Sequence, residues 1–288
     1  MKAAIVGAGG QLGRALSTVL PDAVVLSRAD LDIVTARAVA AYDWSGVDVL
    51  VNAAAYTAVD QAETPEGRVA AWAANATAVA HLAAAANNHG MTLVHVSTEY
   101  VFDGHGSEPF AEDAPLCPLS AYGASKAAGD VAAAVAARHY IVRTTWVIGQ
   151  GANFVRTMLG LAARGVSPAV VADQIGRLTF ADNLAAGIVA LIQRRTPHGV
   201  YNLTNTGDPG SWADVARATF ELAGYPASRV TDTTTAAYFA DKPQAARRPR
   251  NSVLDLDKAR TAGIVLPPWR QSLTDFIKQE TKQEAAVR

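Results

Sequence analysis

The sequence predicts an α/β fold in which a doubly wound parallel sheet is followed by a smaller C-terminal lobe. Three observations support this prediction. Short β-rich runs alternate with helical stretches over the first half of the chain, as in βαβ units. A glycine-rich turn joins the first run to the first helical stretch. After Gly149 the alternation loosens, and prolines separate shorter elements.

Five apolar runs in the first half are predicted strands: Ala3–Val6, Val24–Leu26, 47–52, 93–97 and 140–143. Helices are predicted at 14–20, at 66–88 and from about Tyr122 onward. The run Val49-Leu50-Val51 has no alternating polar residues, which is typical of strands covered by helices on both faces. These strands should therefore form one buried parallel sheet.

A domain boundary is predicted near residue 150. Residues 1–150 would form the sheet domain, and residues 151–288 would mainly form the second lobe. Segments after residue 150 could also contribute strands to the sheet. The polar stretch 279–288 is predicted to be a frayed end of the chain.

The composition favours a small-molecule ligand. With 18% charged residues and a formal net charge of -1, the chain has no basic field to attract nucleic acid or an acidic membrane surface. We therefore expect no nucleic-acid partner and no membrane partner. The longest stretch without formal charge, 69–90, is alanine-rich but interrupted by residues such as Asn75 and His81, so we interpret it as a buried helix too polar to span a membrane.

The single cysteine, Cys117, cannot form an internal disulfide, and the first residues run into a strand without a basic-then-apolar leader. We expect a cytoplasmic protein.

The glycine turn has the context of a phosphate-binding loop, because it follows a strand and opens a helix. Its backbone N–H groups and the helix dipole can meet a pyrophosphate. The Gly7, Gly10, Gly13 spacing is typical of short-chain reductases, whereas the general dehydrogenase fingerprint needs a small residue where Leu12 stands. Tight packing alone is the competing interpretation. The predicted cofactor contacts in this turn are Gly7, Gly9, Gly10, Gln11, Leu12 and Gly13.

The end of the second strand carries Ser27-Arg28 where NAD-binding proteins usually place an acid on the ribose 2′-hydroxyl. Because an arginine suits a 2′-phosphate, we expect NADPH, with NADH as the alternative cofactor and a solvated surface arginine as the competing interpretation. Small residues end the third strand and permit close approach of a cofactor, although simple close packing explains them equally well. The remaining predicted cofactor contacts are Asp32, Ile33, Ala53, Ala54 and Ala55.

Tyr122 and Lys126 lie at i and i+4 on one helical face. A ketone reductase must give a proton to the developing alkoxide, and a free phenol with a pKa of about 10 is a reluctant donor at neutral pH. A nearby ammonium lowers that pKa. Upstream, Thr98 follows an apolar strand at the edge where ligands bind, so its hydroxyl can polarise a carbonyl. We predict Thr98, Tyr122 and Lys126 to be catalytic.

These residues resemble the extended short-chain dehydrogenase/reductase family, and within it the dTDP-4-dehydrorhamnose reductases, nearly from end to end. The strings that carry the resemblance run in the family's order: 52–60 (NAAAYTAVD), 96–102 (VSTEYVF), 143–147 (RTTWV), 173–174 (DQ), 247–252 (RRPRNS) and 266–269 (LPPW). The resemblance implies a Rossmann-type dinucleotide-binding domain, a nucleotide-sugar lobe, and NAD(P)H-dependent reduction of the C4 ketone of dTDP-4-dehydro-β-L-rhamnose to dTDP-β-L-rhamnose.

The resemblance also implies roles for single residues. Tyr122 is expected to be the acid, Lys126 to lower its pKa and hold the nicotinamide ribose, and Thr98 to bind the carbonyl. Arg247 and Asn251 would face the diphosphate, for which an arginine fork is suited, although a solvated basic loop is the competing interpretation. The other expected substrate contacts are Thr57, Val59, Glu99, Tyr100 and Trp146.

The sequence departs from the family pattern at three places. Glu99 replaces the usual aspartate and Leu178 replaces a proline, which affects the local shape of the sugar pocket. Some members form magnesium-linked dimers through glutamates, one of them just after the glycine turn, where this chain has Arg14-Ala15. We therefore expect no metal, and either a monomer or a weak homodimer.

Other activities remain alternatives at this point. A dehydratase characteristically follows the threonine with an Asp-Glu pair, whereas this chain has Glu99-Tyr100. An epimerase, or another nucleotide-sugar 4-ketoreductase such as dihydrostreptose synthase, stays open. A non-catalytic regulatory subunit, of the kind related to the β subunit of methionine adenosyltransferase, is disfavoured because all three catalytic residues are present.

Overall fold

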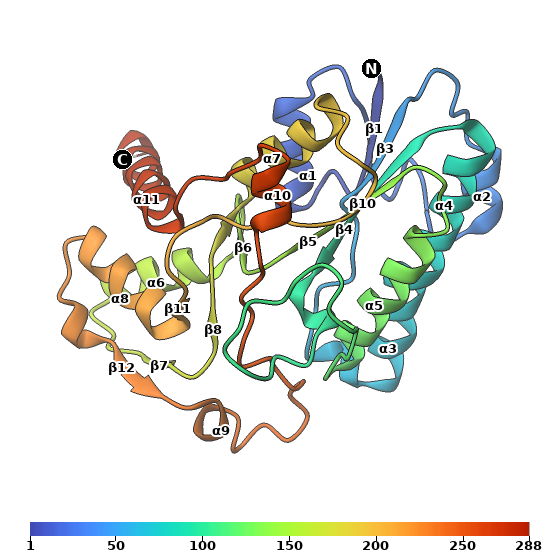
Figure 1. The fold of residues 1–288 in the computed structure, drawn as a ribbon. Coiled ribbons are helices and arrows are strands. Elements are labelled where there is room, and N and C mark those ends of the chain that lie inside the picture. The colour runs from blue at the N-terminus through green and yellow to red at the C-terminus, as the bar shows by residue number, and fades with distance from the viewer. Residues whose placement is uncertain (288) are drawn as a thin grey trace.

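The computed structural model describes residues 1–287 and contains a six-stranded parallel sheet in the order β2-β1-β3-β4-β5-β10 (Figure 1). Every neighbouring pair in this sheet runs in parallel. The predicted Rossmann-type α/β class is confirmed. The strands are β1 (Ala3–Val6), β2 (Val24–Leu26), β3 (Val49–Asn52), β4 (Thr92–Thr98), β5 (His139–Thr144) and β10 (Gly199–Asn202).

The strand order reverses between β1 and β3. From β1 the chain first adds β2 on one side, and it then crosses to add β3, β4, β5 and β10 on the other. At such a switch point the loops beyond the carboxyl ends diverge and leave a crevice for a ligand. The glycine turn after β1 and the alanine segment after β3 both lie there.

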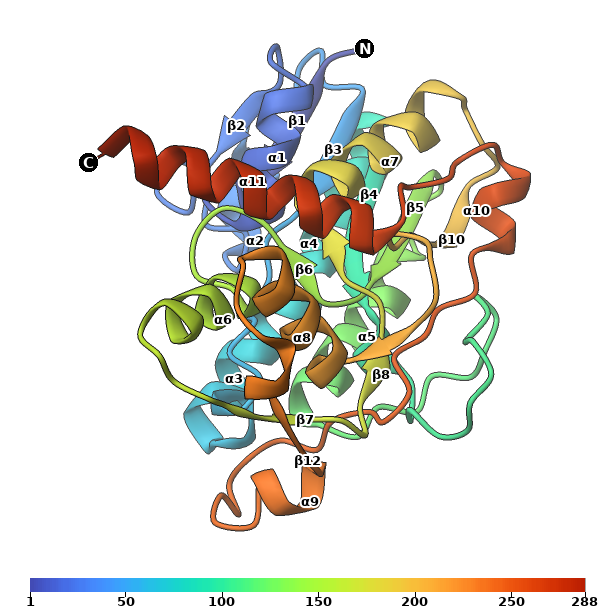
Figure 2. The ribbon, with the colours of Figure 1, turned by 90° about the vertical axis from the view of Figure 1, so that its left-hand side faces the viewer.

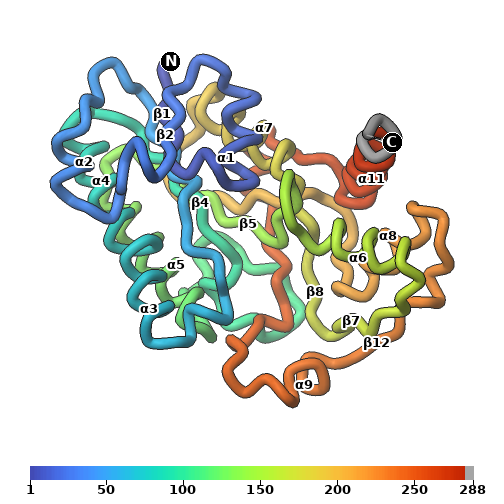
Figure 3. Tube along the Cα trace, turned by 180° about the vertical axis from the view of Figure 1, so that it is seen from behind, coloured from blue at the N-terminus to red at the C-terminus, as the bar shows by residue number. Residues whose placement is uncertain are grey.

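Helices cover both faces of the sheet (Figures 1 and 3). On one face α1 (Gln11–Val19) and α7 (Ala181–Gln193) bury Leu16 and Ile188 against the strands, together with α10 (Asp257–Thr261). On the other face α2 (Ala36–Ala41) and the long helix ending at His89 pack on the sheet, with α5 (Ala121–Ala133) beside them. This double covering explains the continuous apolar strands.

The alanine-rich stretch forms one continuous helix in three parts: α3 (Pro65–Trp72), a π-helical segment η2 (Ala73–Thr77) and α4 (Ala78–His89). Thr64 caps it by accepting a hydrogen bond from the Gly67 N–H, and Gly90 ends it with a φ of 63°. The helix Pro65–His89 is long enough and apolar enough to cross a membrane. Our expectation that this stretch is too polar to do so was therefore wrong. Its contacts with α5, β3 and β4 instead support the interpretation as a packed helix.

The second half builds a smaller lobe beside the carboxyl end of the sheet (Figure 2). Two apolar clusters fill it, one around Phe180 and Trp269 and the other around Phe220. Its helices are α6 (Phe154–Ala163), α8 (Trp212–Leu222), α9 (Thr235–Tyr238) and α11 (Trp269–Val287). Its paired short strands are β6 (Val147–Ile148) with β9 (Thr179–Phe180), β7 (Ala169–Val171) with β12 (Thr231–Thr233), and β8 (Ile175–Gly176) with β11 (Gly210–Ser211).

Two features of the second half bear on the predictions. Helix α7, helix α10 and strand β10 belong to the sheet domain although they follow residue 150, so only part of segment 151–288 forms the lobe. The frayed end that we expected from residue 279 is instead helical as far as Val287, and Glu280 forms a bidentate ion pair with Arg156 of α6. Arg288 lies outside the described residues.

Candidate active site

The glycine turn is held in place by close backbone contacts. Gly7 has a φ of +82°, and a Cβ there would lie 2.4 Å from the backbone nitrogen of Ala54. A Cβ on Gly13 would lie 2.3 Å from the carbonyl oxygen of Gly7. Gly9 is different, because no atom lies within 4 Å of its ideal Cβ position. The outer glycines therefore close the turn, and the exposed middle leaves space above it.

The same turn offers unpaired donors to an anion. Gly10 is the N-cap of α1, which has no side-chain cap and no acidic residue in its first turn, so the first N–H groups of the helix and its dipole face outward. Gln11 Oε1 is buried and has no hydrogen-bond partner among the described residues, but as an acceptor it adds nothing to the binding of an anion. The outward-facing N–H groups fit a bound pyrophosphate.

A cavity of about 380 Å³ adjoins the turn between the ends of β1, β2 and β3. It fits the adenosine half of a dinucleotide. Its lining includes Gly7, Ser27, Arg28, Asp32, Ile33, Ala54 and Ala55. A larger hollow of about 1080 Å³ lies at the opposite edge of the sheet, beside Asp48 and Arg138. We assign the cofactor to the smaller cavity, since parallel sheets bind ligands at their carboxyl edge.

Arg28 lies at the mouth of this cavity with an exposed side chain, and no ion pair engages it within residues 1–287. The nearest acid in sequence, Asp30, is occupied by Ser27, whose N–H and hydroxyl both donate to Asp30 Oδ2 (2.8 and 2.6 Å). These hydrogen bonds hold the pKa of Asp30 below its usual value. The guanidinium is thus free to meet a 2′-phosphate.

The other predicted cofactor contacts differ in position. Asp32 accepts hydrogen bonds from the Val34 N–H and the Thr35 hydroxyl, which shape the loop after β2. Leu12 is buried in the sheet core, so its part in cofactor binding is to anchor α1. Ala53 continues the β3 ladder by donating its N–H to the Val6 carbonyl.

Thr98 ends β4 and caps the following 3₁₀ turn η3 (Glu99–Val101) by accepting a hydrogen bond from the Tyr100 N–H. Its hydroxyl donates to Glu99 Oε2 at 2.7 Å. The Glu99 side chain is buried, and its other oxygen has no partner among the described residues. Burial raises the pKa of Glu99 to about 7, although the hydrogen bond from Thr98 lowers it. Glu99 therefore titrates near neutral pH.

Tyr122 lies on the first turn of α5, which Ser120 caps by accepting a hydrogen bond from the Gly123 N–H. A Cβ on Gly123 would collide with the carbonyl oxygen of Tyr100, so this glycine lets α5 approach η3 closely. Tyr100 meets Tyr122 edge to face with ring centroids 5.4 Å apart. Tyr122 is thereby fixed beside Thr98 and Glu99.

The pKa of Tyr122 is raised well above its ordinary value, chiefly by burial and then by the charge of Glu99, while a hydrogen bond with Thr98 lowers it. We expected the Lys126 ammonium to lower this pKa. The structure does not show that effect, because Lys126 Nζ donates instead to the Val96 carbonyl at 2.7 Å. Burial lowers the pKa of Lys126 to about 8.

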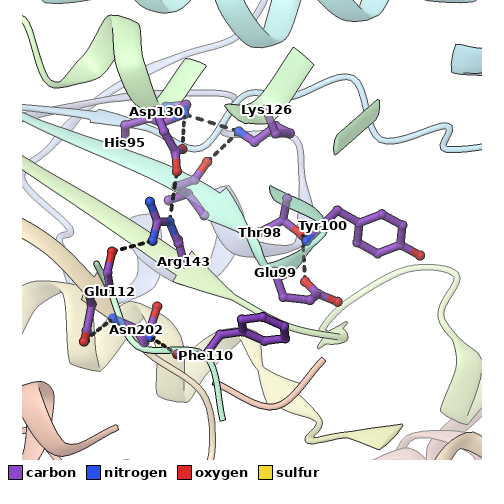
Figure 4. Close-up of polar contacts among 11 residues, drawn as sticks. His95, Thr98, Glu99, Tyr100, Phe110, Glu112, Lys126, Asp130, Arg143 and Asn202 are labelled. Atoms are coloured by element: carbon purple, nitrogen blue, oxygen red, sulfur yellow. Dashed lines mark hydrogen bonds and ion pairs between the residues drawn. The ribbon is translucent and has the colours of Figure 1, made fainter. Parts of the chain in front are cut away.

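Lys126 is joined to a buried polar network that the sequence did not predict (Figure 4). His95 Nε2 lies 3.4 Å from Lys126 Nζ and 4.0 Å from Asp130 Oδ1. Asp130 Oδ2 accepts a hydrogen bond from Arg143 Nε at 3.0 Å, and Arg143 also donates to the Glu112 carbonyl. One signal was available in the sequence, because Tyr122, Lys126 and Asp130 follow one another at helical spacing.

Trp146 has a φ of 41°, the left-handed region that bulky residues rarely adopt. Its ring stacks on Trp212 of the C-terminal lobe with centroids 3.8 Å apart. Gly176 packs against the same ring, and a Cβ there would lie 2.8 Å from it. Strained backbone held by its surroundings is common where a ligand binds. Leu178, which replaces the family's proline, is fully buried in the cluster behind this ring.

The remaining predicted substrate contacts are only partly brought together. Val59 and Tyr100 pack against Tyr122, whereas Thr57 and Arg247 are exposed. Asn251 is buried, and its amide donates to the Glu108 carbonyl and accepts from the Val253 N–H. These bonds hold the chain locally. The arginine that contacts the sheet domain is Arg248 rather than Arg247. Arg248 forms an ion pair with Asp60, which we did not predict.

Comparisons with known proteins agree with this geometry. The family described as RmlD substrate binding domain matches residues 1–282. The dTDP-4-dehydrorhamnose reductase of Burkholderia thailandensis is 40% identical over 95% of this chain and 97% of its own length. A probable dTDP-4,6-dihydroxy-2-methyloxan-3-one 4-ketoreductase of Streptomyces antibioticus is 40% identical over 96% of this chain and 94% of its own.

A solved structure extends the likeness to the fold. The crystal structure of dTDP-4-dehydrorhamnose reductase from Bacillus anthracis in complex with NADP has a TM-score of 0.89 and 34% identity, and the match covers 96% of this chain and 99% of that one. The predicted family and the NAD(P) cofactor class are confirmed. The chain therefore belongs to the RmlD substrate binding domain family, within the extended short-chain dehydrogenases/reductases.

Proposed function

We propose that this chain catalyses the NAD(P)H-dependent reduction of the C4 ketone of dTDP-4-dehydro-β-L-rhamnose to dTDP-β-L-rhamnose, the last step of dTDP-rhamnose biosynthesis. The observation that carries the proposal is the convergence of Thr98 and Tyr122 at the carboxyl edge of the sheet that also carries the glycine turn. Acid, oxyanion stabiliser and cofactor cradle are what ketone reduction requires.

The cofactor supplies the hydride, and the glycine turn with the cavity beyond it holds the dinucleotide. The roles of the single residues are part of the proposal. Tyr122 gives its phenolic proton to the oxygen of the reduced carbonyl. Its raised pKa keeps it protonated until that oxygen becomes basic, and the Lys126 ammonium would hold the nicotinamide ribose.

Thr98 would polarise the ketone, and Glu99 controls whether it is able to. When Glu99 is ionised, the Thr98 hydroxyl donates to it. When Glu99 is protonated, its own O–H can donate to Thr98, and the Thr98 hydroxyl is then free to donate to the ketone oxygen. A neutral Glu99 also removes a charge that opposes ionisation of Tyr122. The working form of the site is therefore the one with Glu99 protonated.

The sugar nucleotide would lie between the sheet edge and the C-terminal lobe. We place the sugar near Val59, Tyr100 and Trp146. Thr57 and Arg247 are exposed and available to a ligand. Asn251 holds the backbone near Arg250 and Ser252 in place. A direct contact of Asn251 with the diphosphate is also part of the proposal.

A second candidate is another dTDP-sugar 4-ketoreductase. It is favoured by the equal identity of the Streptomyces antibioticus relative, whose name gives a different 4-keto sugar. Both candidates share the thymidine nucleotide and the C4 ketone, and the sugar in the name of that relative lacks the C2 hydroxyl that the rhamno-configured ketone carries. NADPH as the preferred cofactor, cytoplasmic localisation, a monomeric or weakly dimeric state, and the domain boundary at residue 150 are also proposals.

The deciding experiment incubates the protein with dTDP-4-dehydro-6-deoxyglucose and NADPH, with and without a 3,5-epimerase that converts this compound to the rhamno-configured ketone. NADPH consumption only with the epimerase, and dTDP-rhamnose as the product by NMR, are the expected results. Equal reduction without the epimerase would favour the second candidate. Conversion without net NADPH consumption would favour an epimerase.

A further inference from the structure

The buried face of α5 carries a third polar residue below the two catalytic ones. Tyr122, Lys126 and Asp130 are spaced at i, i+4 and i+8, so they lie along one face of the helix. Asp130 is 3% exposed and lies one turn beyond Lys126. A carboxylate at this depth is costly unless it interacts with positive charge or hydrogen-bond donors.

His95 faces the same place from β4, and its neighbours fix where its proton lies. Asn52 Oδ1 accepts a hydrogen bond from the Ala54 N–H, so the Asn52 amide presents its nitrogen to His95 Nδ1, 3.1 Å away. Nδ1 must therefore accept, and the proton of the neutral ring is on Nε2. Burial, followed by the charge of Lys126, lowers the pKa of His95 well below its usual value, which keeps the ring neutral.

The Nε2–H group thus points into the space shared by Lys126 Nζ and Asp130 Oδ1. Two donors, the imidazole N–H and the ammonium, meet there. Asp130 Oδ1 is the acceptor available to them, because it has no hydrogen-bond partner among residues 1–287. Its other oxygen is already held by Arg143.

We propose that Asp130 and His95 are a positioning pair for Lys126, in which Asp130 supplies the counter-charge for the ammonium and His95 Nε2–H orients the carboxylate. The pair acts through Lys126 and touches neither substrate nor cofactor. The inference rests on the proposed function, because it assigns the pair to the lysine of the same reductase site.

The surroundings determine how removal of the pair should act. Burial lowers the pKa of Lys126 to about 8, and the charge of Asp130 opposes that effect. The titratable groups that surround Lys126 on α5, β4, η3 and β5 are Tyr122, Asp130, His95, Glu99, Tyr100 and Arg143. Glu63, in the 3₁₀ turn η1 (Gln61–Glu63), faces the start of α5, where its carboxylate accepts a hydrogen bond from the Ala121 N–H. The facing segment η2 carries no titratable side chain. Asp130 lies one helical turn from Lys126, and its charge is the one that raises the pKa of Lys126.

The test replaces Asp130 by asparagine, which keeps the shape and an acceptor for Arg143 but removes the charge. The direct readout is the pKa of Lys126, measured by NMR of protein labelled with 13C at lysine Cε and assigned with a Lys126→Met variant. We expect Asp130→Asn to lower this pKa by about one unit, because the charge of Asp130 is what raises it against the effect of burial. The alkaline limb of kcat should move to lower pH by the same amount.

Glu112→Gln is the matched control. It makes the same carboxylate-to-amide change in the same network, where Glu112 Oε1 accepts from the Asn202 N–H, away from Lys126 (Figure 4). We expect it to leave the Lys126 pKa unchanged. An equal shift in both variants would mean a general field effect and would overturn the assignment to Asp130.

Asp130→Asn leaves Arg143 without its counter-ion and can fail to fold. His95→Gln removes no charge and serves as the second variant. We expect a smaller downward shift of the Lys126 pKa, and in a folded double variant no shift beyond that of Asp130→Asn alone. An unchanged Lys126 pKa in His95→Gln, or a loss of kcat that is uniform across pH, would refute the positioning role. Because the NMR titration needs no substrate, failure of this proposal is distinguishable from failure of the proposed reaction.

Discussion

Arg248 donates two hydrogen bonds to the carboxylate of Asp60, one of them from Nη2 to Oδ2 at 2.8 Å, and so joins the C-terminal segment to the loop after β3. Asp60 also accepts from the Ala246 N–H, and Arg248 lies over the ring of Phe239 at 4.8 Å. This bridge closes beside Tyr100, the residue that packs on the catalytic tyrosine. It fixes one wall of the proposed sugar site relative to the sheet.

Asp60→Asn should weaken binding of the sugar nucleotide more than turnover. The bidentate charged pair loses its charge, and because Asp60 is half exposed we expect a rise in KM for the sugar of about threefold to tenfold with little change in kcat. Steady-state kinetics at saturating NADPH measure this. The control is Asp257→Asn in the exposed Asp257–Arg260 pair of α10. A parallel rise in KM for NADPH would argue against a local effect.

Glu99→Gln should remove a pH dependence of the reaction. The pKa of Glu99 is raised to about 7, so its carboxyl is protonated below that pH and ionised above it. Since the ionised form takes the hydrogen bond of Thr98, kcat/KM of the wild type should fall as pH rises through about 7. The amide of glutamine can donate to Thr98 at every pH. We expect the variant to lack this fall, with the exposed Glu66→Gln as a control; a fall that persists would exclude Glu99 as its source.

The two glycine variants Gly9→Ala and Gly13→Ala should separate cofactor binding from folding. A methyl group at Gly9 enters open space, so stability should be unchanged while NADPH binding weakens. At Gly13 it meets backbone atoms at 2.3 Å, and overpacking of this kind costs about 1–3 kcal/mol. Urea unfolding and NADPH fluorescence titrations measure the two effects. Equal stability of both variants would contradict the geometry of the turn.

Arg28→Ala should reduce the preference for NADPH over NADH. We propose that the Arg28 guanidinium, which lines the cavity, binds the 2′-phosphate that NADH lacks, and a charge-assisted contact of this kind contributes about 1.5–3 kcal/mol. We expect the ratio of kcat/KM values for the two cofactors to fall at least tenfold. Arg37→Ala, an exposed arginine of α2, is the control. An unchanged ratio would leave Arg28 as a surface residue.

Tyr122→Phe should abolish proton donation and leave cofactor binding intact. Loss of a general acid lowers kcat by about 10²- to 10⁴-fold. The phenyl ring keeps the edge-to-face contact with Tyr100, so the fold and the NADPH dissociation constant should stay close to the wild type. Single-turnover NADPH oxidation and equilibrium titration report the two quantities. Reduction at the wild-type rate would refute the assignment.

Local patterns predicted most of the sheet. The strands Ala3–Val6 and Val24–Leu26 have the predicted bounds, and the others differ by one or two residues. The position of β10 was not predicted, because Gly199–Asn202 pairs with β5 across more than fifty residues and carries few apolar residues. The last part of α11, from residue 279, was mistaken for a frayed end because the residue that pairs with it, Arg156, lies more than a hundred residues earlier.

The sequence predicted those parts of the site that depend on residues close together in the chain. The glycine turn and the tyrosine-lysine pair depend on a single turn or helix face. The contacts of His95, Arg143, Trp212 and Arg248 depend instead on which segments meet in space, and no local pattern encodes that. The contact of Lys126 Nζ with the Val96 carbonyl was not predicted for the same reason, because Val96 belongs to β4 and Lys126 to α5.

The π-helical segment η2 places Asn75 where its amide holds both backbone groups of Tyr56 and donates to Ser125, next to Lys126. A π segment contains one residue more than the α-helix would use for that turn. Deletion of a single alanine from it would return this turn to the α-helical form and leave the orientation of α3 against α4 nearly the same, because the extra residue is what widens the turn. Such a deletion would remove the widened turn that presents Asn75 to Tyr56 and Ser125, so the site depends on the number of residues in this turn as much as on their identity.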